Sequence, residues 1–163
     1  MSLSKIRKIK EAGATFQSHV DGRKYELSPE RAMEIQRLLG SDIQMQLDQC
    51  ISFPHTDKEA EKAMQLSLRW AERSRRAFQV RPGAAVFGIV QGGAEKAARI
   101  ESARALAGMD FGGLAIGGLS KAANIDSTNK VLVITPTTDK LSLKEEVAAV
   151  LNFLDKRGIV KHK

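Results

Sequence analysis

The chain has 163 residues, of which 42% are hydrophobic, 28% are charged and only 5% are aromatic, and its formal net charge is +7. This composition indicates a globular protein with a mainly aliphatic core and excludes a disordered chain. The apolar runs are too short for a membrane span, the basic N-terminal stretch does not resemble a secretory signal, and one cysteine excludes a disulfide framework. We therefore expect a cytoplasmic protein without a metal or another cofactor.

The first third of the sequence predicts a hairpin followed by a helix. Residues 1–11 are basic and are interpreted as a frayed turn of helix. An Asp-Gly pair favours a tight two-residue turn between strands over residues 14–20 and 23–27, because both residue types tolerate positive φ. Ser28 and Pro29 then suit the N-cap and the first turn of a helix that ends near residue 40.

Residues 41–50 predict a strand with chemistry at its end. Ile43, Met45 and Leu47 alternate with glutamines, which is the period of a strand with a buried face. Asp48 and Cys50 follow, and they point the same way if the backbone stays extended. Ligands bind at the carboxyl ends of strands in parallel α/β folds. The alternative interpretation is a loop-capping aspartate and an ordinary buried cysteine.

The next element is a long helix over residues 57–78. Thr56 and Glu59 form a capping-box pattern at its start. We expect an apolar face towards the core, with Trp70 near its edge. The core-facing residues would be Ala60, Met64, Leu68, Ala71 and Phe78. Arginines cluster between residues 69 and 81, and they are either a phosphate-binding face or a solvated surface.

Two further strands end in residues that suit a binding site. The apolar run over residues 84–90 predicts a strand covered on both faces, and Gln91 follows it. After a helix over residues 95–107, a shorter strand ends at Gly117 and Gly118. Because helices and strands alternate, we expect a parallel sheet whose strand ends meet at one rim.

The last part of the chain, residues 120–163, is interpreted as a βα unit packed into the same domain. It contains a strand over residues 130–135 and a second capping box, from Ser142 to Glu145, that opens a helix ending near residue 156.

Seven stretches within residues 1–119 resemble, in order and spacing, runs of sequence in bacterial-type tRNA-guanine transglycosylases, also called queuine tRNA-ribosyltransferases. They are GATFQSHVDG (13–22), LSPER (27–31), LGSDI (39–43), LDQC (47–50), RWA (69–71), FGIVQG (87–92) and AIGGL (115–119). The resemblance implies about half of a (β/α)8 barrel. It also implies an activity, the exchange of guanine in a tRNA anticodon for a 7-deazaguanine base through a covalent intermediate on an aspartate.

By the same resemblance, a purine base is bound at the predicted rim. The implied substrate-binding residues are Asp48, Cys50, Gln91, Gly117, Gly118 and Leu119. Asp48 matches the carboxylate that reads the N–H edge of the base, Gln91 matches an amide that also bonds the base, and Gly118 matches a backbone donor to its carbonyl. These groups suit an edge that carries both donors and acceptors.

The sequence also departs from the family pattern. Gly112 and Leu114 stand where the family shows an aspartate and an aromatic residue before the glycine pair. No aspartate after residue 119 matches the nucleophile, so we assign no catalytic residue. The Cys-x-Cys-x2-Cys…His zinc cluster has no counterpart, because Cys50 is the only cysteine.

These observations predict an α/β fold with a parallel sheet and flanking helices, derived from half a barrel and preceded by a β-hairpin. A flavodoxin-like doubly wound sandwich and a barrel-like homodimer are the alternatives. The expected function is that of a transglycosylase-derived domain that keeps part of a guanine or 7-deazaguanine pocket but has no base-exchange activity by itself. The alternatives are a scaffold, chimera or fragment with relic motifs, and an enzyme completed by a partner. Net charge gives weak support for tRNA as a partner.

Overall fold

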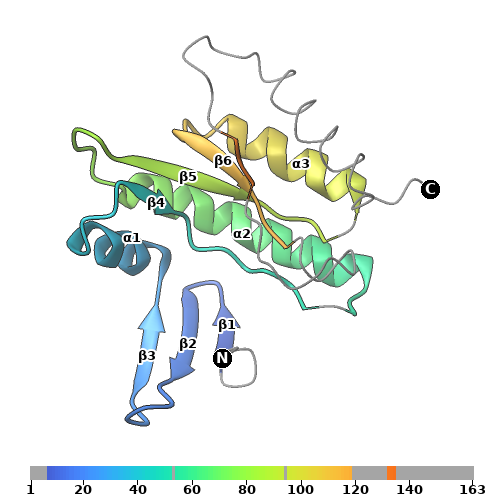
Figure 1. The fold of residues 1–163 in the computed structure, drawn as a ribbon. Helices are drawn as coiled ribbons and strands as arrows, with labels where there is room; N and C mark the ends of the chain where they lie inside the picture. The colour runs from blue at the N-terminus through green and yellow to red at the C-terminus, as the bar shows by residue number, and fades with distance from the viewer. Residues whose placement is uncertain (1–6, 53, 94, 119–131, 135–163) are drawn as a thin grey trace.

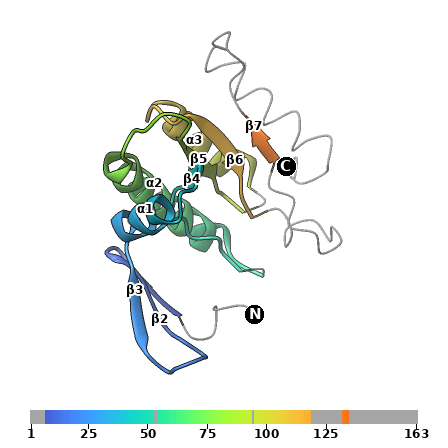
Figure 2. The same cartoon turned by 60° about the vertical axis from the view of Figure 1, so that its left-hand side comes forward.

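The computed structural model describes residues 7–52, 54–93, 95–118 and, for the backbone, 132–134 (Figure 1). Within these ranges the chain forms a three-stranded sheet, here called sheet A, and a four-stranded sheet, here called sheet B. In both views sheet A lies beyond α1, on the side away from sheet B (Figures 1 and 2). The expected α/β fold with a parallel sheet, flanking helices and an N-terminal hairpin is confirmed, and it is consistent with derivation from part of a barrel.

Sheet A is an antiparallel meander of β1 (Arg7–Lys10), β2 (Gly13–Gln17) and β3 (Lys24–Leu27). The helical turn expected near the N-terminus is wrong for residues 7–10, because pairing with β2 draws them into an extended strand. A basic alternating sequence has no strong preference by itself, so its neighbour decides its conformation.

The connection between β2 and β3 is longer than the expected two-residue turn. Ser18 N donates to Arg23 O at 2.8 Å, and Gly22 N donates to Ser18 O at 3.0 Å. Within this loop the Asp21 carboxylate accepts from Arg23 N at 3.1 Å. Local side-chain hydrogen bonds of this kind stabilise a wider turn, so the strands begin and end further from the Asp-Gly pair.

Helix α1 (Pro29–Leu38) begins as predicted, since the Ser28 hydroxyl accepts from Arg31 N at 3.2 Å. From this helix the Gln36 amide pairs with the exposed edge of β4 (Ile43–Met45). It donates to Met45 O at 2.9 Å and accepts from Met45 N at 2.8 Å. One side chain thereby satisfies the two backbone groups that a neighbouring strand would otherwise bond.

The face that β4 buries differs from the expected one. Gln44 and Gln46 are 1% and 3% exposed, whereas Ile43 is 50% exposed. The Gln46 amide donates to Ser67 O at 3.2 Å and accepts from Ile89 N at 3.0 Å, whereas the amide atoms of Gln44 have no partner among the described residues. Hydrophobic alternation identified the strand but not the side that the helices cover.

Helix α2 (Asp57–Ala77) begins with the predicted capping box between Thr56 and Glu59. Trp70 was expected near the edge of its apolar face, and this is wrong because the residue is fully buried. Its Nε1 donates to Glu11 O at 2.8 Å, in the turn between β1 and β2. Helix α2 therefore buries a second face against sheet A, which its sequence does not show.

Sheet B has the order β4-β5-β6-β7. Strands β5 (Ala85–Val90) and β6 (Gly113–Ile116) are parallel to β4, and α3 (Lys96–Ala107) connects them. Strand β7 (Leu132–Ile134) joins β6 in the antiparallel direction. Residue 119 and the second capping box with its helix lie outside the described residues.

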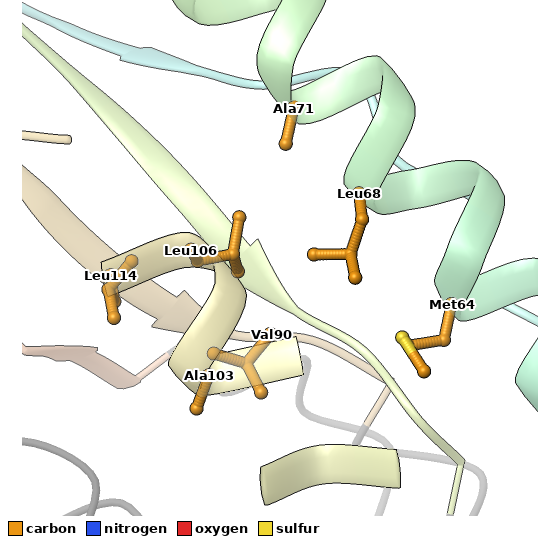
Figure 3. Close-up of a cluster of buried hydrophobic side chains, with 7 residues drawn as sticks. All are labelled: Met64, Leu68, Ala71, Val90, Ala103, Leu106 and Leu114. Atoms are coloured by element: carbon orange, nitrogen blue, oxygen red, sulfur yellow. The ribbon is translucent and has the colours of Figure 1, made fainter. Parts of the chain in front are cut away.

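The core lies where α2 and α3 cover sheet B (Figure 3). It is made of small and aliphatic side chains, as the low aromatic content predicts: Met64, Leu68, Ala71, Val90, Ala103, Leu106 and Leu114. Burying each large member contributes about 1.5–3 kcal/mol. Among the described residues, no helix is long and apolar enough to cross a membrane.

Arginines of α2 attach sheet A to the rest of the structure. Arg69 bonds the Glu11 carboxylate at 2.8 Å, and Arg73 bonds the Glu30 carboxylate at 2.7 Å. Arg73 also donates to Glu11 O at 2.8 Å and to Ala12 O at 3.1 Å. The Arg73 guanidinium lowers the pKa of Glu30 from 4.5 to about 2.

Glu30→Gln should destabilise the protein at pH 7 by no more than about 1 kcal/mol, because the ion pair is partly exposed to solvent. The folded-state pKa is lowered, so the wild-type advantage is complete above the unfolded pKa and is lost as the pH falls through about 2. Urea unfolding of both proteins at pH 7 and near pH 2 measures the difference in their free energies of unfolding with and without the charged carboxylate. Glu26→Gln, which removes an exposed carboxylate of β3, is the control. An undiminished loss near pH 2 would contradict the assignment.

Candidate functional site

The carboxyl ends of β4, β5 and β6 lie side by side because these strands are parallel neighbours. Gln91 follows β5 directly, and its Nε2 donates to Asp48 Oδ2 at 2.5 Å. A Cβ placed on Gly118 would lie 3.0 Å from Gln91 Oε1 and 3.7 Å from Cys50 Sγ. The structure therefore brings Asp48, Cys50, Gln91, Gly117 and Gly118 to one rim, whereas the remaining candidate, Leu119, lies outside the described residues.

The Asp48 carboxyl is the titratable group at the centre of this rim. Burial raises its pKa, and the hydrogen bond from Gln91 and the charge of Arg7 on β1 oppose the shift. A carboxylate taken from water is unstable unless donors surround it. Asp48 is therefore suited to accept further N–H groups from a bound molecule.

The two glycines let the backbone of β6 approach the other strand ends closely. A Cβ on Gly117 would collide with Gln91 Nε2 and would lie 2.7 Å from Ile89 Cγ2. Gly118 has φ +72°, a conformation that favours glycine. A flat molecule at the rim would therefore contact bare backbone at this position.

Serines on the covering helices hold the backbone at the strand ends. Each hydroxyl accepts from a backbone N–H that the sheet leaves without a partner: Ser74 from Leu47 at 3.3 Å, Ser67 from Gln49 at 2.9 Å and Ser102 from Gln91 at 3.2 Å. These contacts fix the segments that carry Asp48 and Gln91.

Arg99 of α3 is a rim residue that sequence reasoning missed. It is fully buried, and it donates to Gly93 O at 2.8 Å, to Val90 O at 3.2 Å and to Gly117 O at 2.8 Å. In the sequence it looks like an ordinary helix arginine. The available signal was its position, about one helical turn after the loop that follows Gln91.

The arginines between residues 69 and 81 are engaged in ion pairs. All five arginines reach a carboxylate within 3.5 Å: Arg69 with Glu11, Arg73 with Glu30, Arg75 with Asp110, Arg76 with Glu72 and Arg81 with Asp42. These pairs join segments far apart in the sequence, with the exception of the Arg76 pair within α2.

A groove of about 810 Å³ lies beside the rim, between β1 and the first half of α2. Gln49 and Ile51 line it, and they alternate with the rim residues Asp48 and Cys50 along the chain. Charged residues of both signs also line the groove: the cations Lys10, Lys58, Lys62 and Arg69, and the carboxylates Glu11, Glu59 and Glu61.

The described residues contain no group of three or more His, Cys, Asp or Glu side chains that could hold a metal ion. With a single cysteine in the sequence, the residues present do not fit the zinc cluster that the resemblance associates with the family.

Comparison with known proteins identifies the family. The family model described as queuine tRNA-ribosyltransferase matches residues 1–150. The chain belongs to this family. The match continues past residue 119, the last residue of the motifs quoted above.

Three similar curated proteins carry the name queuine tRNA-ribosyltransferase. The protein of Mesorhizobium japonicum is 61% identical over 120 residues, which are 74% of this chain and 32% of the relative. That of Brucella suis is 52% identical over 141 residues, 84% of this chain and 37% of the relative. That of Agrobacterium fabrum is 57% identical over 120 residues, again 74% and 32%. The chain thus spans about a third of the length of these queuine tRNA-ribosyltransferases.

Asp48→Asn should stabilise the protein at pH 7, because asparagine keeps an acceptor for Gln91 without burying a charge. Folding raises the pKa of Asp48, so the gain is absent below the unfolded pKa of about 4 and grows until the pH exceeds the folded pKa. Each unit of raised pKa corresponds to about 1.4 kcal/mol.

Thermal melting of both proteins near pH 3.5 and at pH 7 measures this gain. Asp42→Asn, which changes an exposed carboxylate paired with Arg81, is the control. A lower melting temperature for Asp48→Asn at pH 7 would show that the charged form is required for stability.

Proposed function

We propose that this chain is a tRNA-guanine transglycosylase-type domain whose rim binds guanine or a 7-deazaguanine base, without exchanging bases by itself. The observation that carries the proposal is the convergence of Asp48, Gln91 and Gly118 at the ends of three neighbouring strands. The family membership supplies the substrate class, and cytoplasm is the compartment that we propose for it.

The hydrogen-bonding pattern of guanine suits these groups. Its ring N–H and amino group present adjacent donors, which a carboxylate such as Asp48 accepts together. Its carbonyl oxygen requires a donor, and the amides of Gln91 and Gly118 supply donors at the same rim. Without a base, the Asp48 carboxylate accepts a hydrogen bond from Gln91. A bound base would replace this donor by two of its own, the ring N–H and the amino group.

Base exchange requires more than this rim. A covalent ribosyl intermediate needs a carboxylate nucleophile as well as stabilisation of the leaving base. The family motifs assign the nucleophile to no aspartate of this sequence, which is why we propose binding without exchange. An enzyme completed by a partner subunit or a second copy, and a scaffold that retains the motifs without binding, are the alternatives.

Calorimetric titration of the folded protein with guanine and a soluble 7-deazaguanine base tests the proposal. We expect saturable binding that Asp48→Ala abolishes and that weakens as the pH falls through the Asp48 pKa, because the base donors bind the carboxylate form. Gly117→Ala should weaken binding by displacing Gln91. Its matched control is Gly108→Ala, where the nearest atom to an added Cβ is 3.5 Å away.

The outcomes separate the alternatives. An absence of heat from a folded protein would favour the scaffold and overturn the proposal. Incorporation of labelled guanine into tRNA by the pure protein would show an active enzyme, and incorporation only after addition of a partner would support the completed enzyme.

For tRNA, we propose contact through the groove lysines Lys10, Lys58 and Lys62, because the arginines of α2 are already ion-paired. Replacing all three lysines by glutamine should reduce the slope of log K against log salt by roughly 2–3. Filter binding between 50 and 200 mM salt measures this slope, and Arg76→Gln is the control. An unchanged slope would place tRNA elsewhere or exclude it.

A further inference from the structure

Arg99 is a buried cation without a carboxylate partner among the described residues. Its side chain is fully buried, and burial lowers the pKa of its guanidinium from 12.5 to about 10, so it remains charged at neutral pH. Burial of an unpaired charge is costly unless hydrogen bonds compensate for it. The role of Arg99 at the rim can therefore be inferred from the hydrogen bonds that its guanidinium makes.

Among the described residues, the acceptors of Arg99 are three backbone carbonyls beside the rim. Val90 O and Gly117 O belong to the residues immediately before Gln91 and Gly118. The third acceptor, Gly93 O, lies in the loop between β5 and α3. One guanidinium thus fixes the ends of two neighbouring strands at the positions that carry the proposed base-binding groups.

The bond to Gly117 O has a specific electronic consequence. This carbonyl belongs to the same peptide unit as the Gly118 N–H, and a cationic donor on the carbonyl polarises the whole unit. Among the described residues the Gly118 N–H has no acceptor. The Arg99 Nη2, also without a described partner, lies 3.5 Å from the point where a Gly118 Cβ would be.

We propose that Arg99 is a positioning residue that orients the Gly117–Gly118 peptide and strengthens its N–H as a donor to the carbonyl oxygen of the base. This inference rests on the proposed base binding. The carbonyl oxygen of a bound base carries partial negative charge, so a strengthened donor holds it more tightly.

Two ligands test this effect. Guanine has the carbonyl, whereas 2-aminopurine lacks both the carbonyl and the ring N–H beside it, so the quantity compared is the loss that Arg99→Met causes for each ligand. Arg99→Met should weaken guanine binding about tenfold, the loss of one strong hydrogen bond, and 2-aminopurine binding less than about twofold. Calorimetry measures both ratios. Equal losses for the two ligands would assign Arg99 to general rim structure and overturn the proposal.

The Gly118 amide resonance tests polarisation without any ligand. In ¹H–¹⁵N spectra it should move in Arg99→Met, while amides of α2 on its sheet A side keep their positions. Arg99→Lys retains the charge with fewer donors, and it should restore part of the shift. If Arg99→Met fails to fold, the Gly118 shift in Arg99→Lys tests the polarisation by itself. A Gly118 resonance that does not move in a folded variant overturns the inference, whereas a wild-type protein that binds no guanine overturns only the proposed function.

Discussion

The parallel pairing of β4, β5 and β6 is the constraint on which the rest of the structure depends. Parallel neighbours require helical crossovers, so α2 and α3 must cover one face of the sheet and their apolar residues form the core there. The same pairing places all three carboxyl ends together. Asp48, Gln91 and Gly118 converge for this reason, although they are far apart in the sequence.

A rim built on strand ends leaves backbone groups that the sheet does not pair. The structure satisfies them with polar side chains from the covering helices, namely serine hydroxyls for N–H groups and Arg99 for carbonyls. Hydrogen bonds replace most of the hydration that these side chains lose, although Arg99 Nη2 has no partner among the described residues. These side chains therefore hold the strand ends in place in the structure without a ligand.

Surface charge has a different role in this domain. The arginines of α2 pair with carboxylates of sheet A, α1 and the segment before β6, so they attach layers of the fold to one another. Each exposed pair contributes little. Together with the bond from Trp70 to Glu11 O they attach sheet A to α2.

Local patterns in the sequence determined most element types, the caps of α1 and α2 and the parallel order of β4, β5 and β6, because capping and periodicity act over a few residues. The candidate rim residues came from the resemblance to family motifs. Tertiary structure alone decided which face of β4 is buried, that residues 7–10 form a strand, and that Trp70 is fully enclosed. The cause is the same in each case. Burial depends on what packs against a residue, and the partners here are distant in the chain. Arg99 is the clearest example, since only the fold places its guanidinium among carbonyls from two strand ends.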